Sequence, residues 1–93
     1  ELVVSSAIAL LHRSVFANNE VRSNLWYQVK GHQLSECIFG RVGCGNIGKD
    51  LVQLLQPFNC KILVNDIEDY ADFYGKNDIT PVSLDELLKV SDV

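Results

Sequence analysis

Three glycines stand close together in the middle of the chain, at Gly43, Gly45 and Gly48. They follow a short run with strand character and precede a stretch with helical periodicity, which is the context that a phosphate-binding turn requires. The glycines would allow, in order, the tight turn, the approach of a phosphate to the backbone, and close packing of the helix on the sheet. The N–H groups of Asn46 and Ile47 would then face the phosphates at the positive end of the helix dipole. The pattern therefore predicts a loop that binds the pyrophosphate of a dinucleotide.

An acidic residue completes this pattern, because Asp66 follows the predicted second strand, 18 residues after Gly48. A carboxylate there can accept hydrogen bonds from both hydroxyls of the adenosine ribose, and it would repel the additional phosphate of NADP. The next residues, 67–69, include no arginine that could bind such a phosphate. We therefore predict NAD as the cofactor, with no metal site. The predicted cofactor-binding residues are Gly43, Gly45, Asn46, Ile47, Gly48 and Asp66.

Three other interpretations of these glycines explain less. The turn spells most of a P-loop, Gly-x-x-x-x-Gly-Lys, but a P-loop needs a hydroxyl at the next position for magnesium, and Asp50 stands there. A methyltransferase loop also holds an adenosine ribose through an acid, but it usually has a glycine where this chain has Ile47. A turn that serves only close packing of a strand and a helix leaves the position of Asp66 without a role.

The elements expected around the loop alternate between helix and strand, because apolar residues recur every three to four positions in some stretches and form continuous runs in others. Such alternation is typical of an α/β fold, here a Rossmann-type doubly wound parallel sheet preceded by a long helix. The expected order is a helix over 3–22, a connection over 23–36, a strand over 38–42, a helix over 46–56, a strand over 60–65, a short helix over 69–76, a strand over 79–82, a helix from 83, and a further strand beginning at 93.

Each expected helix has an apolar face. Pro57 ends the second long helix, and Ser83 with Glu86 forms a capping box at the start of the last. We expect Trp26 and Tyr27 to pack the connection against the domain. The apolar positions are Val4, Ile8, Leu11 and Val15 in the first helix, then Ile47, Leu51, Leu54, Leu55 and Phe58, then Tyr70, Phe73 and Tyr74, and finally Leu84, Leu87, Leu88 and Val90.

Composition excludes several classes of function. The net charge is −4 and the basic residues are scattered, which argues against nucleic-acid binding. The longest apolar stretch, 2–11, is too short to span a membrane. Three cysteines without a Cys-x-x-Cys pair are typical of reduced thiols in a cytoplasmic protein. The chain has no methionine and begins with Glu1, so we expect a piece cut at both ends, with an entry helix and connection over 1–36 and a βαβαβα core over 37–93.

Several stretches besides the glycine turn look familiar, and together they cover nearly the whole chain: 8–26, 31–34, Gly43–Lys49, Asp66, Val82–Leu88 and Ser91–Val93. Through them the sequence resembles the D-isomer-specific 2-hydroxyacid dehydrogenases, and within them the phosphoglycerate dehydrogenase branch. The resemblance implies an oxidoreductase that transfers hydride between NAD and a 2-hydroxy or 2-keto acid. It also implies a homodimer formed with the help of the first helix. The family's catalytic arginine, acid and histidine would come after Val93, so we name no catalytic residue and expect this piece alone to be inactive.

A second hypothesis is a binding module, which binds NAD without turnover and uses it to sense redox state or to control assembly. A third is an adenosine-binding methyltransferase domain. His12 and His32 lack an obvious partner for acid–base catalysis, so we assign them surface or structural roles. For Cys44, we favour a small residue filling a slot in the loop over a reactive thiol.

Arg41 departs from the resemblance, because the family usually has an aliphatic residue inside the first strand. A buried, unpaired guanidinium would be costly. We expect its head either to reach out at the end of the strand or to pair with an acid. The alternatives are a destabilised piece or an error in the sequence. Direct contact with a phosphate is not expected, since a side chain at this position precedes the loop and points into the sheet layer.

Overall fold

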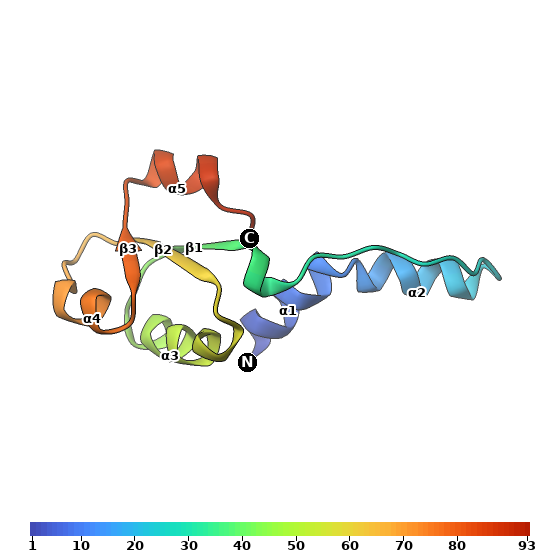
Figure 1. Ribbon diagram of the computed structural model, residues 1–93, viewed down its shortest axis with the longest axis horizontal. Coiled ribbons are helices and arrows are strands. Elements are labelled where there is room, and N and C mark those ends of the chain that lie inside the picture. Colours follow the sequence, from blue (N-terminus) through green and yellow to red (C-terminus); the bar gives the residue numbers. More distant parts are fainter.

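The computed structural model describes residues 1–93 and has two parts (Figure 1). One part is an α/β unit, in which helices lie on both sides of a small sheet. The other is an arm, made by two N-terminal helices and the chain that returns alongside them, and the molecule is elongated, with extents of 51 × 24 × 19 Å. The elements are α1 (Leu2–Leu11), α2 (Ser14–Arg22), the 3₁₀ helix η1 (Leu34–Glu36), β1 (Ile38–Val42), α3 (Asn46–Leu55), the 3₁₀ helix η2 (Gln56–Phe58), β2 (Lys61–Asn65), α4 (Ala71–Lys76), β3 (Ile79–Pro81) and α5 (Leu84–Val90).

The sheet is parallel, with its strands in the order β1-β2-β3. Gly40 stands beside Leu63 in the register, and Arg41 stands beside Val64. Helices α3 and α4 cover one face of the sheet and α5 covers the other (Figure 1). The predicted α/β fold with a parallel sheet is confirmed, and the first strand has the predicted bounds.

The last residues of the chain run along the free edge of β1. The N–H of Asp92 donates to the carbonyl of Ile38, and the N–H of Gly40 donates to the carbonyl of Val93, each at 2.8 Å. The carboxylate of Asp92 also accepts the N–H of Ile38 at 2.7 Å. These bonds lie on the side of β1 opposite β2, where a doubly wound sheet places its next strand.

The single helix predicted over 3–22 is wrong, because the structure divides it into α1 and α2. The break falls at His12 and Arg13, where Arg13 has a φ of 52°, outside the helical range. The N–H of Arg13 donates to the carbonyl of Leu10 at 3.1 Å, so the end of α1 is tightened into a 3₁₀ turn.

A tertiary contact accounts for this break. In a continuous helix the carbonyl of Leu11 would accept the N–H of Val15. It accepts instead the N–H of His32 in the returning chain, at 3.2 Å. Gly31 lies so close to His12 that an added Cβ would stand 2.8 Å from the His12 Cα. Helical periodicity could not reveal this contact, since it joins segments far apart in the sequence.

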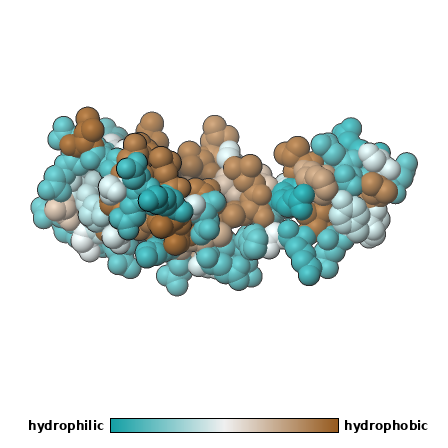
Figure 2. Space-filling view, turned by 90° about the horizontal axis from the view of Figure 1, so that it is seen from above, coloured by the Kyte–Doolittle hydropathy of each residue, from teal (hydrophilic) through white to brown (hydrophobic).

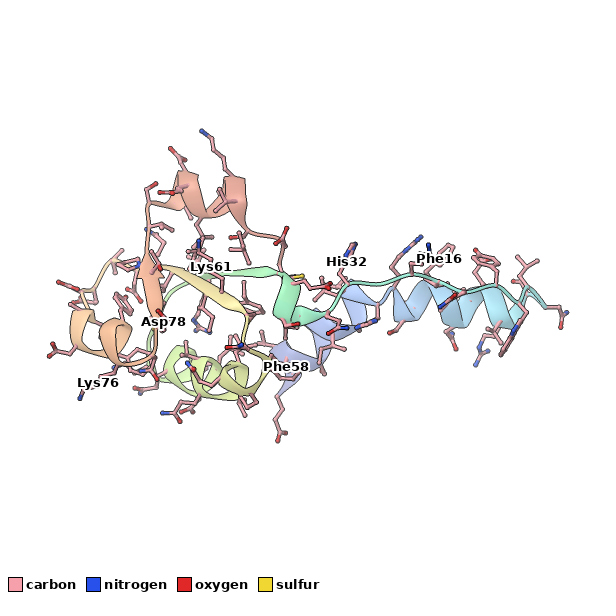
Figure 3. The ribbon with its side chains drawn as sticks, in the orientation of Figure 1. Phe16, His32, Phe58, Lys61, Lys76 and Asp78 are labelled. Atoms are coloured by element: carbon pink, nitrogen blue, oxygen red, sulfur yellow. The ribbon has the colours of Figure 1, made fainter.

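The outer arm is not packed against the α/β unit (Figure 3). Trp26 is 89% exposed, so the prediction that it packs the connection against the domain is wrong. Tyr27 is also exposed, and its hydroxyl donates to the carboxylate of Glu20 at 3.1 Å. Val15, predicted on the buried face, is exposed as well. The returning chain is therefore fastened to the helices of the arm and not to the sheet.

The core lies between the sheet and α3, with the inner part of α1 closing one end. Phe58 packs against it where α3 ends near α1 (Figure 3). Seen from above, apolar side chains gather between α5 and α1, while polar ones dominate the tip of the arm (Figure 2). The buried cluster consists of Ala7, Leu34, Phe39, Cys44, Leu51, Val52, Leu55, Ile62, Val64, Tyr74 and Ile79.

The helix faces differ from the predicted ones in detail. In α3, Val52 is buried, whereas Ile47 is 78% exposed, although helical spacing placed Ile47 on the apolar face. In α5 only Leu87 is buried, and Leu84 and Leu88 are exposed. A helix on the outside of a small sheet contacts it along a narrow stripe, so leucines beside that stripe remain accessible.

Only part of the predicted capping box of α5 is present. The Ser83 hydroxyl accepts the N–H of Glu86 at 3.2 Å, as predicted. In η1, the carboxylate of Glu36 accepts the N–H of Gln33 at 3.3 Å.

None of the helices in the chain has the length and apolar character needed to cross a membrane.

Candidate nucleotide-binding site

The chain leaves β1 and enters α3 through a tight turn. Gly43 has a φ of +89°, a left-handed value that side chains rarely adopt. Its N–H donates to the carbonyl of Asn65 at 2.7 Å, which fastens the turn to the end of β2. A Cβ added at Gly43 or Gly45 would meet no atom within 4 Å. The turn is therefore closed on the strand side and open on its outer side.

The N-terminus of α3 is exposed at the edge of this open space. Gly45 precedes the helix, and Asn46 and Ile47 in its first turn are exposed. The N–H of Lys49 donates to the carbonyl of Gly45 at 2.9 Å. The earlier N–H groups of a helix have no carbonyl within the helix to bond, and they carry the positive end of its dipole. This end of α3 can accept an anion.

Gly48 lies against the side chain of Arg41. A Cβ at Gly48 would stand 2.5 Å from the Nη2 of Arg41 and 2.7 Å from its Cζ. The half-buried Arg41 thus extends from β1 beneath the first turn of α3, and its Nε donates to the carbonyl of Gly43. Of the two expectations for Arg41, its head reaches the end of the strand, and its bonding partner is a loop carbonyl and not an acid. The space at Gly48 is filled by this guanidinium.

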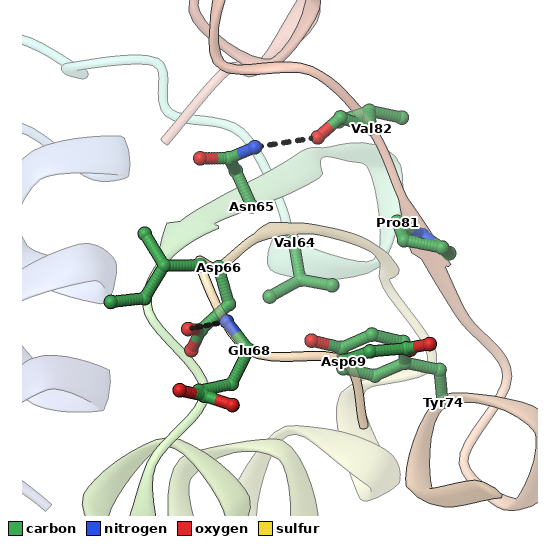
Figure 4. A pocket seen from close by; sticks show the side chains of 9 residues that line it. Val64, Asn65, Asp66, Glu68, Asp69, Tyr74, Pro81 and Val82 are labelled. Carbon is green, nitrogen blue, oxygen red and sulfur yellow. Dashed lines mark hydrogen bonds between the residues drawn. The ribbon is translucent and has the colours of Figure 1, made fainter. Parts of the chain in front are cut away.

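Asp66 directly follows β2 and is hydrogen-bonded to two segments, its own loop at Glu68 (Figure 4) and the glycine turn at Cys44. Its carboxylate accepts the N–H of Glu68 at 2.9 Å and the N–H of Cys44. The N–H of Glu68 lowers the pKa of Asp66 most, and the N–H of Cys44 lowers it next. The Ile67 N–H and the Arg41 charge lower this pKa further, whereas desolvation raises it. The carboxyl group is therefore ionised at neutral pH, at a fixed distance from the turn.

A cavity of about 250 Å³ lies next to Asp66, at the carboxyl ends of β2 and β3 (Figure 4). Asn65 closes one side of it, because its side-chain amide donates to the carbonyl of Val82 at 2.9 Å. Ligands of open α/β sheets bind at this end of the strands. The cavity is lined by Val64, Asn65, Asp66, Ile67, Glu68, Asp69, Tyr74, Pro81 and Val82.

Cys44 is completely buried inside the turn, as the slot-filling interpretation predicted. Burial raises the pKa of its thiol, although the neighbouring Arg41 opposes this effect. The thiol is therefore protonated at neutral pH and has little nucleophilic character. All three cysteines are free thiols, and no group of three or more acidic, histidine or cysteine side chains is arranged to hold a metal ion.

Two features of the site were not predicted from the sequence. One is the bridge from Asn65 to Val82, and the other is the bond from the Cys44 N–H to Asp66. An amide residue at the end of a strand was the available signal for the first. His32 lies where the arm begins, away from the turn (Figure 3), and His12 directly follows α1 beside Gly31.

Comparison with known proteins identifies the family to which the chain belongs. Residues 4–93 match the family model described as "D-isomer specific 2-hydroxyacid dehydrogenase, NAD binding domain". Because this match covers nearly the whole chain, the chain belongs to that family, as the resemblance implied. Its three-stranded parallel sheet is the corresponding part of a Rossmann NAD-binding domain.

Individual relatives agree with this assignment. A D-specific alpha-keto acid dehydrogenase of Enterococcus faecalis is 37% identical over 67 residues, which are 70% of this chain and 18% of the relative. A D-lactate dehydrogenase from Lactobacillus jensenii, solved with NAD+, is 18% identical and has the same fold, with a TM-score of 0.88 over 98% of this chain and 28% of that one. The D-lactate dehydrogenase of Aquifex aeolicus, complexed with NAD and lactic acid, is 26% identical, with a TM-score of 0.84 over 96% of this chain and 27% of that one. The chain thus spans less than a third of each.

Proposed function

We propose that this chain binds NAD through the glycine turn and the carboxylate of Asp66. The observation that carries the proposal is the bond between the Cys44 N–H and Asp66, which joins the anion-accepting end of α3 to an ionised carboxylate. A pyrophosphate at the turn and an adenosine ribose at the carboxylate are the two parts of a dinucleotide that such an arrangement recognises. The proposed binding residues are Gly43, Gly45, Asn46, Ile47, Gly48 and Asp66.

NAD is preferred to NADP in this proposal. Asp66 is held ionised, so an additional phosphate on the ribose would meet a negative charge. Glu68 and Asp69 add two acids along the same cavity. The nearest guanidinium, that of Arg41, lies beneath α3 and is bonded to the Gly43 carbonyl. No basic side chain lines the cavity beside Asp66.

The whole protein, in this proposal, transfers hydride between NAD and a 2-hydroxy or 2-keto acid. Family membership supports this reaction, as do the names of the relatives, a D-specific alpha-keto acid dehydrogenase and D-lactate dehydrogenases. NAD supplies the hydride chemistry when bound. The contribution of this chain is to bind and orient it, with the catalytic side chains expected after Val93. The phosphoglycerate dehydrogenase branch stays a prediction about the substrate.

Asp66→Ala tests the binding proposal in the intact protein. We expect it to weaken NAD binding by about tenfold, the effect of losing one charged hydrogen-bonding group, and to narrow the preference for NAD over NADP. Affinities for both dinucleotides are measured by titration calorimetry. Glu20→Gln is the matched control, because it removes one negative charge from the arm and should leave both affinities unchanged. An unaltered preference in Asp66→Ala would contradict the assignment of Asp66.

A turnover assay distinguishes an enzyme from a module that only senses NAD. The intact protein is assayed for NADH oxidation with a panel of 2-keto acids, including pyruvate and branched-chain and phosphorylated members. Oxidation with any of them supports the dehydrogenase proposal and identifies the substrate. NAD binding without oxidation of NADH across the panel would favour the sensing hypothesis.

A further inference from the structure

Arg41 places a cation inside the strand–turn–helix unit that forms the candidate site. Its side chain starts near the carboxyl end of β1, where its backbone stands beside Val64 in the register, and extends towards the turn. There the guanidinium lies beneath Gly48, in the first turn of α3. It stands on the strand side of the same turn whose exposed N–H groups face outward.

Two consequences follow from this position. The first is mechanical, because the Nε bond to the Gly43 carbonyl fastens the turn from below, at the residue with the left-handed backbone. The second is electrostatic, because a guanidinium is always charged and partial burial weakens the screening of its field. The positive charge adds to that of the helix dipole at the same end of α3.

A purely space-filling role would not need this residue. An aliphatic side chain at position 41 would pack between Gly48 and the sheet without the cost of desolvating a guanidinium. Arg41 bonds a backbone carbonyl of the loop, while its guanidinium stays next to the first turn of α3. The orientation therefore leaves its charge available to an anion on the other side of the turn.

We propose that Arg41 is a positioning residue for the pyrophosphate of NAD, which holds the Gly43 turn in its binding conformation and supplies a fixed positive charge beneath it. The inference rests on the proposed NAD-binding function. It predicts that a substitution at position 41 changes the affinity for ligands that carry phosphates and leaves the affinity for adenosine unchanged.

The test compares two ligands in the intact protein by titration calorimetry. ADP carries the diphosphate and the adenosine ribose, whereas adenosine carries no phosphate. We expect Arg41→Leu to weaken ADP and NAD binding by about tenfold, on the scale of one partly screened charge, and to change adenosine binding by less than about twofold. Arg41→Lys keeps the charge without the Nε bond, so it should recover part of the loss. Raising the salt concentration should narrow the difference between Arg41→Leu and the unaltered protein.

The opposite results are equally specific. Equal losses for ADP and adenosine would show a merely structural role, and an unchanged ADP affinity would show no role, so either would overturn the inference. If Arg41→Leu does not fold, Arg41→Lys and Arg41→Gln give the same comparison, with the Gln variant expected to lose more ADP affinity than the Lys variant and neither to lose adenosine affinity. Failure of the unaltered protein to bind NAD or ADP at all would instead overturn the proposed function itself.

Discussion

A single carboxylate, that of Asp66, connects the glycine turn to the end of β2. It accepts N–H groups from both segments, so its charge stabilises the site before any ligand arrives. Arg41 bonds the same turn through the Gly43 carbonyl. The turn is thus bonded both to a cation on β1 and to an anion that directly follows β2.

The lowered pKa of Asp66 predicts how stability depends on pH. A carboxyl group whose pKa is lower in the folded than in the unfolded chain stabilises the fold above the ordinary aspartate pKa of about 3.9, and this contribution is lost as the pH falls through the folded value. The unaltered protein should therefore exceed Asp66→Asn in stability by a constant amount between about pH 5 and pH 8. The difference should disappear in stronger acid. Urea unfolding of both proteins over this range measures it, and a difference that grew on acidification would contradict the assigned bonds.

Spacing was sufficient to predict where single residues lie along the strand, turn, helix and second strand. Gly43 and Gly45 belong to one turn, and the distance to Asp66 corresponds to one helix and one strand. The contact of the Arg41 head with Gly48 could not be predicted, because it depends on how β1 and α3 approach each other. The burial of Cys44 was predicted because a slot in a tight turn admits only a small side chain.

Strand β1 and helix α3 contact each other through Arg41 and Gly48. The three atoms nearest to a Cβ at Gly48 all belong to the Arg41 guanidinium. Gly48→Ala should therefore push this group away from the Gly43 carbonyl and cost about 1–2 kcal/mol in unfolding free energy. In an Arg41→Val background the obstacle is absent, and Gly48→Ala should gain up to about 1 kcal/mol from helix propensity.

A double-mutant cycle measured by chemical denaturation checks this prediction. Gly75→Ala in α4 is the matched control, because a Cβ there would meet nothing within 4 Å. It should stabilise both backgrounds equally, by up to about 1 kcal/mol. If Gly48→Ala costs the same with and without Arg41, the backbone of the sheet and not the guanidinium sets the need for glycine.

At the same scale, the order of elements could be predicted but the ends and faces of helices only in part. The alternation of apolar patterns predicted β1, α3 and β2 within about a residue of their bounds. The break between α1 and α2 could not be predicted, since it depends on His32 bonding the Leu11 carbonyl. Ile47 shows a second limit, because helical spacing does not reveal how far the sheet extends beneath a helix.

The whole molecule is an α/β unit with a projecting arm. Few side chains within the arm cover its apolar residues, so several of them are exposed. Leu10 is 73% exposed and Val15 is 71% exposed, and they line a hollow of about 270 Å³. Phe16, on the arm in Figure 3, lines the same hollow. Arg13 lies against the Phe16 ring, 4.3 Å from its centroid. Sequence periodicity identified an apolar stripe here but could not show that the α/β unit leaves its outer half uncovered.

We expect this exposed stripe to be covered by a second copy of the protein, as the homodimer implied by the family resemblance requires. Burying two such stripes against each other would remove large apolar side chains from water in both copies, and a twofold interface repeats each contact. Phe16→Glu would place a charge in that interface without a partner. Sedimentation velocity of the intact protein should show a dimer, and Phe16→Glu should shift it towards the monomer at micromolar concentration.

Leu88→Glu in α5 is the control for this prediction, because it introduces the same charge at an exposed leucine on the other part of the molecule. It should leave the dimer intact, since α5 lies on the far side of the sheet from α3 and away from the arm (Figure 1). The NAD affinity of the Phe16→Glu monomer shows whether the substitution affects assembly alone or also binding. The glycine turn and Asp66 lie wholly within the α/β unit of one copy. A protein that is monomeric without any substitution, or a dimer that persists in Phe16→Glu, would contradict the assignment of the arm to the interface.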